Sequence, residues 1–329
     1  MSEYNVAIVG ATGLVGRKII QVLEERRFPV KNLILLASEK SAGSKLKFNS
    51  DDIKVEKLSP EKFKGVEIAF FSAGTDVSCE FVPEAVKRNC IVIDNSSAFR
   101  LRDDVPLVVP EVNKGKISEH KGIIANPNCS TIQLVVVLKP LHDKFKVKRV
   151  VVSTYQSVTG AGKRGIDQLF AEIKGDKILN PKFPHQIAFN CIPHIDNFYE
   201  DGYSKEEHKI MKETIKIIGD NSIKITATCV RVPVIGGHSE AVNIEFEKDF
   251  EIEEIRDVLN NSPGIVLYDD PYNNAYPMPL ISHEKDEVFV GRIRRDYSSE
   301  NALNLWIVAD NLRKGAATNA VQIAEELIK

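Results

Sequence analysis

The sequence predicts an α/β protein with an N-terminal Rossmann-like doubly wound domain and a second, α+β domain that contains a mixed sheet. Over residues 1–130, short runs rich in β-branched residues alternate with helical patterns. These runs are apolar without alternation, which is typical of strands buried on both faces of a parallel sheet. The repeated order of strand, helix and strand then indicates a doubly wound domain.

The elements of this first domain follow one another in a regular order. Strands are predicted at 5–9, 33–38, 68–73, 91–96 and 122–126, and helices at 14–27 and 79–89. Helices in such an order cover the faces of a parallel sheet.

From about residue 147 the pattern changes. The strand-like stretches become longer and alternate between apolar and polar residues, which favours a sheet with one face partly exposed. Such strands are predicted at 147–158, 223–234, 240–247 and 300–310, with helices at 163–174, 204–219 and 252–261. The segment 310–329 reads as an amphipathic helix, which we expect to pack back on the first domain. The predicted domains are therefore 1–128 with 310–329, and 129–309.

The composition excludes several classes of function. The formal net charge is -2, which does not indicate a nucleic-acid partner. No apolar run approaches the roughly 20 residues that a membrane span needs. The five cysteines are an odd number without a C-x-x-C pair, which argues against disulfides or a zinc site and favours the reducing cytoplasm. We therefore expect no metal, membrane or nucleic acid.

A glycine-rich loop, "GATGLVG", follows the first predicted strand and opens the first helix. Gly10, Gly13 and Gly16 let the backbone approach a pyrophosphate, while the helix N-terminus supplies N–H donors and a positive dipole. The alternative is a tight turn between strand and helix. The position directly after the first strand favours dinucleotide binding.

The end of the second predicted strand bears on the choice between NADP and NAD. An acidic residue there would bind a ribose 2′-hydroxyl and disfavour a 2′-phosphate. Ser38 occupies that position, and Lys40 and Ser41 follow it. Hydroxyls and an ammonium suit a phosphate, although Glu39 would oppose it if it turned inward. The sequence therefore favours NADP.

Cys129 follows the turn "NPN" and begins an apolar helix. A helix N-terminus favours the thiolate, which is the reactive form of cysteine. The alternative is a small buried hydrophobic residue, and we interpret Cys191 and Cys229 in that way. This segment alone does not decide between chemistry and packing for Cys129.

Among seven histidines, His238 differs from the others because it follows "VIGG" after a strand that also carries Arg231. A histidine on such a turn is well placed to face a cleft, although a surface loop is the simpler interpretation for the residue alone. A cysteine nucleophile and a nicotinamide domain in the same chain favour a catalytic role.

Five motifs in this order, "GATGLVG", "DNSSAFR", "PNCST", "TYQSVTGAGKRG" and "CVRVPVIGGHSEA", resemble the aspartate-β-semialdehyde dehydrogenase family, from about residue 5 to the C-terminal helix. The resemblance implies NADPH-dependent reductive dephosphorylation of aspartyl phosphate to aspartate semialdehyde, through a Cys129 thioester. It also implies a place in the biosynthesis of lysine, threonine, methionine and isoleucine, and a homodimer or homotetramer. The first predicted domain would bind NADP, and the second would carry catalysis and dimerisation.

The same resemblance assigns a role to each candidate residue. It implies that Cys129 is the nucleophile, that His238 is the acid/base and that Gln156 orients the substrate carbonyl. Arg231 would hold the substrate carboxylate, for which a guanidinium is geometrically suited. Arg100 and Lys209 would hold phosphate with Asn95 nearby, and Glu206 would pair with the substrate ammonium. The residues implied to contact NADP are Gly10, Thr12, Gly13, Leu14, Val15, Ser38, Lys40, Ser41, Thr159, Gly160 and Asn311.

Several of these residues have simpler interpretations. Arg100 could pair with Asp103 or Asp104, and Glu206 and Lys209 could form a solvated helix face. Gln156 could lie on an ordinary polar strand face. Other substrates on the same scaffold are N-acetyl-γ-glutamyl phosphate or a malonyl thioester, and a catalytically inactive NADP-binding sensor is a further alternative.

Overall fold

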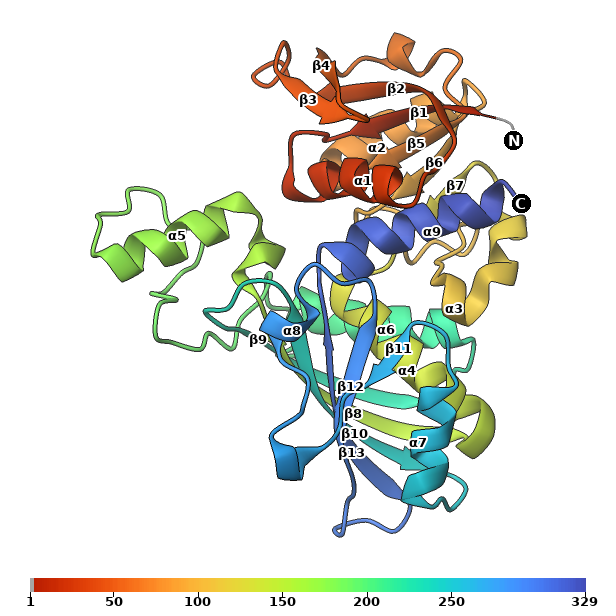
Figure 1. Ribbon diagram of the computed structural model, residues 1–329, viewed down its shortest axis with the longest axis vertical. Coiled ribbons are helices and arrows are strands. Elements are labelled where there is room, and N and C mark those ends of the chain that lie inside the picture. The colour runs from red at the N-terminus through yellow and green to blue at the C-terminus, as the bar shows by residue number, and fades with distance from the viewer. Residues whose placement is uncertain (1–2) are drawn as a thin grey trace. The chain divides into compact units, whose positions relative to one another are not determined.

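The computed structural model describes residues 3–329 and divides into two compact units. Of the described residues, the first unit comprises 3–128 with Ala316–Lys329, and the second comprises Cys129–Gly315. The first unit contains a mainly parallel sheet and the second a mixed sheet (Figure 1). The predicted fold class is therefore confirmed.

The sheet of the first unit has the strand order β3-β4-β2-β1-β5-β6-β7. Its strands are β1 (Tyr4–Val9), β2 (Val30–Ala37), β3 (Lys45–Phe48), β4 (Asp51–Lys57), β5 (Ile68–Phe71), β6 (Ile91–Asp94) and β7 (Ile123–Ala125), and its α-helices are α1 (Leu14–Glu25), α2 (Thr75–Val86), α3 (Pro110–Asn113) and α9 (Thr318–Leu327). β2 pairs with one side of β1 and β5 with the other, both in parallel. β1 therefore marks the switch point at which open α/β sheets bind ligands.

The core of this unit joins the sheet to helices from both ends of the chain. α1 buries Ile19 and Leu23 at helical spacing, against Val6 and Ile8 of β1. The C-terminal helix α9 adds Val321 and neighbouring alanines to the same core. Burying each large apolar side chain stabilises the fold by about 1.5–3 kcal/mol. This is the packing that the amphipathic pattern of the C-terminal segment predicted.

The hairpin of β3 and β4 was not predicted from the sequence. β3 reads "KLKF", in which only Leu46 and Phe48 are buried, and β4 carries mostly charged residues. Asn49 and Ser50 connect the strands with φ angles of 47° and 73°. Positive φ at both central residues is the geometry of a two-residue hairpin turn. The pattern was missed because an edge hairpin lacks the continuous apolar runs of the buried strands.

The second boundary of the units lies after Gly315, and the prediction of 310 was wrong by six residues. The Asp310 carboxylate accepts hydrogen bonds from the backbone N–H groups of Leu312 and Arg313, at 2.8 and 3.1 Å, and of Glu284 at 2.9 Å. These bonds hold 310–315 in the second unit. The segment 310–329 is also not one helix, because a π-helical turn at Arg313–Ala317 precedes α9.

The sheet of the second unit has the order β11-β12-β13-β10-β8-β9. Its strands are β8 (Val147–Gln156), β9 (Lys224–Arg231), β10 (His238–Phe246), β11 (Ile265–Leu267), β12 (Val288–Arg295) and β13 (Ala302–Ala309), and its α-helices are α4 (Cys129–Phe145), α5 (Lys163–Lys174), α6 (Lys205–Ile218), α7 (Ile252–Asn260) and α8 (Pro279–Ser282). β8 and β9 are parallel, whereas β10 is antiparallel to both β8 and β13. β11 and β12 were not predicted.

α4 packs against β8, β10 and β13, while α6 packs against β9 and α4 (Figure 1). These two helices cover one face of the mixed sheet. Since successive side chains of a strand point to opposite faces, every second residue of β8, β9 and β10 points toward them. Among residues 3–329, no helix combines the length and the apolar character needed to cross a membrane.

Candidate functional site

The glycine loop after β1 leaves no room for side chains at two of its three glycines. Gly10 has a φ of 85°, and a Cβ there would lie 2.9 Å from the backbone of Ser72. A Cβ on Gly16 would lie 2.3 Å from the Gly10 carbonyl oxygen, so this residue must be small for α1 to approach the turn. Gly13 is the N-cap of α1, and no side chain caps it. The loop therefore presents backbone N–H groups at a helix N-terminus, as a pyrophosphate site requires.

The segment after β2 forms a turn in which the Ser38 carbonyl oxygen accepts the N–H groups of Ser41 and Ala42, at 3.0 and 3.1 Å. Ser38 and Lys40 are exposed and Ser41 is half-buried. The Glu39 carboxylate lies 3.0 Å from the ammonium of Lys57 on β4. This ion pair partly neutralises the acid that could oppose a 2′-phosphate.

Buried amides connect Asn95 to the C-terminal helix within the first unit. The Asn126 Nδ2 donates to Asn95 Oδ1 over 2.8 Å, and Asn319 Nδ2 donates to Asn126 Oδ1 over 2.7 Å. Arg100 Nη2 in turn donates to the Asn95 carbonyl oxygen over 2.7 Å. Asn126 and Asn319, which the sequence did not suggest as site residues, therefore fix the loop that presents Asn95 and Arg100. Asp104, suggested as a partner of Arg100, pairs with Arg102.

In the second unit, the covered face of the sheet brings together three predicted residues that are distant in sequence. Gln156 pairs with Arg231 across β8 and β9. His238 begins β10, and the next residue, Ser239, pairs with Tyr155. Gln156, Arg231 and His238 are all buried. The three residues therefore form one row at the ends of three neighbouring strands.

Cys129 is the first residue of α4, which covers this face. Its side chain is half-buried. A Cβ on Gly315 would lie 2.9 Å from the Cys129 Cβ, so a side chain at position 315 would displace Cys129. One turn along α4, Gln133 Nε2 donates to the His238 carbonyl oxygen over 3.3 Å. The helix that begins at Cys129 is thus tied to the strand that begins at His238.

His238 is held in a defined orientation and protonation state. The Ser157 backbone N–H donates to its Nδ1 over 3.0 Å, so in the neutral ring the proton resides on Nε2. Burial, and then the positive charge of Arg231, lower the pKa of His238 to about 3. Within the part of the chain that the structure describes, no group hydrogen-bonds Nε2. His238 is therefore a neutral imidazole with an unused N–H donor.

Arg231 and Gly160 lie beside this donor. Arg231 Nη1 donates to the Ser157 carbonyl oxygen over 2.7 Å, and its guanidinium lies over the Phe183 ring, 5.9 Å from the centroid. Burial lowers the pKa of Arg231, while Glu206 and then Cys129 act in the opposite direction. A Cβ on Gly160 would lie 3.0 Å from Arg231 Nη1 and 3.2 Å from His238 Nε2. A side chain at position 160 would therefore displace Arg231 and His238 from this arrangement.

Glu206 and Lys209 occupy one face of α6 and are bonded to each other. Lys209 Nζ lies 3.0 Å from Glu206 Oε2 and 2.9 Å from Asp196 Oδ2. Gln156 Nε2 donates to the other carboxylate oxygen, Glu206 Oε1, over 3.1 Å. Burial acts against the charge of Lys209, but Glu206 and Asp196 outweigh it and raise the pKa of the ammonium. Glu206 is buried, so the pair is not an ordinary solvated helix face.

Thr159 and Asn311, both predicted to contact NADP, are bonded to each other in the second unit. Thr159 Oγ1 donates to Asn311 Oδ1 over 2.8 Å and also contacts the Ser157 hydroxyl at 2.7 Å. Ser157, which the sequence did not suggest, therefore supports Thr159 through its side chain and His238 through its backbone. Its position directly after Gln156 in "TYQSVTG" was the only available signal.

The predicted residues divide between the two units. The first unit contains Gly10, Thr12, Gly13, Leu14, Val15, Ser38, Lys40, Ser41, Asn95 and Arg100, and the second contains Cys129, Gln156, Thr159, Gly160, Glu206, Lys209, Arg231, His238 and Asn311. Of the other cysteines, Cys229 is buried as expected, whereas the packing interpretation of Cys191 was wrong because this residue is exposed in an irregular segment.

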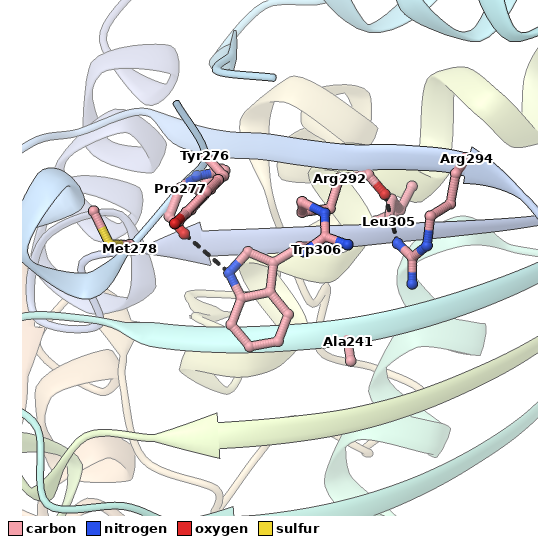
Figure 2. Close-up of a pocket in the computed structure, with 8 residues that line it drawn as sticks. All are labelled: Ala241, Tyr276, Pro277, Met278, Arg292, Arg294, Leu305 and Trp306. Carbon is pink, nitrogen blue, oxygen red and sulfur yellow. Dashed lines mark hydrogen bonds between the residues drawn. The ribbon is translucent and has the colours of Figure 1, made fainter. Parts of the chain in front are cut away.

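The opposite face of the mixed sheet carries a separate pocket. Figure 2 shows its lining residues, which are Ala241, Tyr276, Pro277, Met278, Arg292, Arg294, Leu305 and Trp306. The Trp306 indole N–H donates to the Pro277 carbonyl oxygen over 3.1 Å, and its ring lies 5.3 Å from that of Tyr155. The pocket contains none of the predicted site residues. It shows that this face exposes aromatic rings and two arginines.

Two family models match the chain. Residues 5–120 match the semialdehyde dehydrogenase NAD binding domain, and residues 138–314 match the semialdehyde dehydrogenase dimerisation domain. A protein of Aquifex aeolicus named aspartate-semialdehyde dehydrogenase is 57% identical over 334 residues, which cover 99% of this chain and 98% of that protein.

Solved structures show the same architecture. Aspartate semialdehyde dehydrogenase II of Vibrio cholerae, described as complexed with ASA, has a TM-score of 0.96 and 48% identity, covering 100% of this chain and 99% of that one. The aspartate semialdehyde dehydrogenase of Candida albicans, solved with NADP, has a TM-score of 0.79 and 27% identity, covering 99% and 98% of the two chains.

Proposed function

The chain belongs to the semialdehyde dehydrogenase family, and from this membership we propose that it interconverts L-aspartyl 4-phosphate and L-aspartate 4-semialdehyde with NADPH. This reaction supplies the pathway to lysine, threonine, methionine and isoleucine. The observation that carries the proposal is the covered face of the mixed sheet. There Gln156, Arg231 and His238 form one row, and Cys129 begins the helix that covers it.

The glycine loop fits a dinucleotide, because Gly10 and Gly16 exclude side chains from a helix N-terminus. When bound, the nicotinamide supplies the hydride chemistry. In the oxidising direction the Cys129 thiolate attacks the aldehyde carbon, and a C–S bond and an oxyanion form. Loss of hydride from that carbon, which the oxidised nicotinamide would accept, gives a thioester. A phosphate oxygen then attacks the thioester, and the C–S bond breaks to return the thiolate and release the acyl phosphate.

His238 has a specific role in this sequence. Because its Nδ1 accepts the Ser157 N–H, its Nε2 presents a proton to the oxyanion. A preorganised donor stabilises the developing charge in each tetrahedral species without transferring its proton. The scheme is balanced without proton transfer to the imidazole, since a thiolate enters the first step and a thiolate leaves the last.

The remaining charged residues suit the ends of an amino-acid substrate. Arg231 provides a guanidinium for the α-carboxylate, and Glu206 a carboxylate for the ammonium. Gln156, which already donates to Glu206, orients the reacting carbonyl. Arg100, with Asn95, and separately Lys209 are proposed as phosphate contacts.

We propose NADP as the preferred cofactor. Ser38 replaces the acid that would select NAD, and Lys40 and Ser41 follow in the same turn. The ion pair of Glu39 with Lys57 reduces the negative charge there. The NADP-bound relative from Candida albicans is consistent with this choice.

A second copy of the chain is the proposed occupant of the exposed face of the mixed sheet. The matched dimerisation domain spans this sheet, and Trp306, Tyr155 and Met278 present apolar surface there. Aromatic and methionine side chains are enriched in subunit interfaces. Analytical ultracentrifugation distinguishes a dimer from a tetramer, and a monomer for the wild-type protein would contradict the proposal.

The cytoplasm is the proposed compartment. Its reducing environment prevents disulfide formation, and none of the five cysteines forms a disulfide in the described residues. A free thiol at Cys129 is also what the proposed chemistry requires.

The test is NADPH formation from aspartate semialdehyde, measured with and without phosphate and with NADP and NAD side by side. We expect phosphate-dependent turnover with NADP. Turnover of N-acetylglutamate semialdehyde or malonate semialdehyde in place of aspartate semialdehyde would assign a different substrate. Binding of NADPH without turnover of any of them would identify a sensor.

A further inference from the structure

Glu240 is a buried acid directly beneath the row of site residues. It lies two residues after His238 on β10, so both side chains point to the face that α4 covers. In the sheet register it pairs with Thr154 of β8, which in turn pairs with Cys229 of β9. Glu240 has no exposed surface. Glu240, Thr154 and Cys229 therefore form a second row of side chains on the same face. This row lies two residues along each strand from the row of His238, Gln156 and Arg231.

The Glu240 carboxyl has no counter-charge in this row. Within residues 3–329, neither of its oxygens has a hydrogen-bond partner of ordinary geometry. The Gln133 side-chain amide is the hydrogen-bonding group that acts on it, so this contact is long or poorly aligned. Burial raises the pKa of Glu240 well above its usual range, which favours the protonated, neutral carboxyl. A buried polar group without a good partner destabilises a fold, so stability does not explain this residue.

Gln133 connects this acid to both catalytic candidates. It lies four residues after Cys129, hence on the same side of α4. Its Nε2 donates to the His238 carbonyl oxygen over 3.3 Å. The Gln133 amide thus bonds the backbone of His238 and also acts on the Glu240 carboxyl.

We propose that Glu240 is a positioning residue that orients the Gln133 amide and so fixes the Cys129 helix against the His238 strand. This inference deepens the proposed function. Other ionisable groups lie near this row. Glu206 and Glu207 act on the Cys229 thiol, as Glu240 does. Arg231, in the neighbouring row, acts on His238. A third ionised carboxylate beside Glu206 and Glu207 would be repelled, whereas a neutral acid can both donate and accept.

The test compares Glu240→Gln with Glu240→Met. Glutamine is a neutral isostere that can bond an amide, so kcat should stay within about threefold of wild type. Methionine fills the space without hydrogen bonding, so kcat should fall roughly 10- to 100-fold, the effect of a small misplacement of reacting groups. The KM for NADP should be unchanged in both variants.

Thermal stability separates positioning from a structural role. Removing an unpaired buried polar group should raise the Tm of Glu240→Met by roughly 2 to 8 °C. The matched control is Glu207→Met, since the buried Glu207 carboxylate accepts the N–H groups of Ser204 and Cys229. Its Tm should fall. A lower Tm and unchanged kcat for Glu240→Met would overturn the proposal.

Two further measurements make the test independent of the turnover assay and of the Glu240→Met variant. The alkylation rate of Cys129 by iodoacetamide should change in Glu240→Met and not in Glu240→Gln, a readout that needs no substrate. If the alkylation rates of the two variants differ from that of wild type in this way, but the wild type does not turn over aspartate semialdehyde, the proposed function fails and the positioning role stands. If Glu240→Met does not fold, Gln133→Met breaks the same connection. A Gln133→Met variant with wild-type kcat and alkylation would contradict the proposal.

Discussion

The Ser157 backbone N–H donates to His238 Nδ1 over 3.0 Å, and this single bond assigns the proton of the neutral imidazole to Nε2. A backbone N–H can only donate, so Nδ1 must be the acceptor. His238 is completely buried and lies beside Arg231, which disfavours a second proton. We therefore propose that His238, which the sequence predicted to be the acid/base, donates a hydrogen bond to an oxyanion.

The lowered pKa of His238, about 3 against an ordinary 6.5, predicts a pH dependence of stability. Between these values an unfolded histidine binds a proton that the folded one rejects. The His238 contribution is therefore fully present above pH 6.5 and is lost as the pH falls toward 3, by about 1.4 kcal/mol per pH unit. Between pH 6.5 and 4.5, the Tm of wild type should fall more steeply than that of His238→Asn. Equal slopes for the two proteins would argue against a buried neutral His238.

Cys129 should be the nucleophile although it is not the most exposed thiol. Cys129→Ser should lose activity by several orders of magnitude and still bind NADPH, because the glycine loop is unchanged. Iodoacetamide should label Cys129 before the exposed Cys79 and Cys191, since thiolate character controls reactivity. Burial raises the pKa of Cys90 to about 12, so that thiol should react slowly. Labelling in simple order of exposure would count against the assignment, as would parallel loss of NADPH binding.

The preference for NADP should depend on the turn after β2. Ser38→Asp places a carboxylate where the 2′-phosphate is expected, so the Kd for NADP should rise through charge repulsion while binding of NAD is retained or improved. Isothermal titration with both cofactors measures this. The control is Glu39→Gln, which removes a charge already paired with Lys57 and should change the ratio little. An unchanged NADP affinity in Ser38→Asp would mean that the contact lies elsewhere.

Glu206 should bind the substrate ammonium. Glu206→Gln keeps the size of the side chain and removes its charge, which costs about 1.5–3 kcal/mol, or roughly 10- to 150-fold in kcat/KM for aspartate semialdehyde. An analogue without the amine should lose much less. Both substrates should be assayed at saturating phosphate, with Glu207→Gln as the control, because Glu207 caps α6 and bonds the Cys229 N–H. Equal losses of kcat/KM for the two substrates in Glu206→Gln would show that Glu206 does not bind the substrate ammonium.

Local patterns were sufficient for many elements of the fold. The helix at 163–174 was predicted with its observed bounds, because its amphipathic pattern ends at Gly175 in the left-handed conformation. Glu206 and Lys209 were expected on one helix face from their spacing alone, and they form an ion pair of 3.0 Å. The strands β3, β4, β11 and β12 were missed. In β3 and β4 the exposed positions carry charges, and their pairing, unlike helical spacing, is not encoded within one short stretch.

The sequence by itself determined the family of this protein, through motifs whose residues are neighbours in the chain, and it located Cys129, His238, Gln156 and Arg231 within them. Only the tertiary structure decided the state of those residues. The proton on His238 depends on Ser157, 81 positions away, and the carboxylate of Glu206 is held by Gln156, 50 positions away. Glu240 reads as one more polar residue of an alternating strand, until α4 closes over it and removes it from water. Hydrogen bonding and desolvation act through space between residues distant in sequence, so the protonation states of this site exist only once the sheet and its covering helix are assembled.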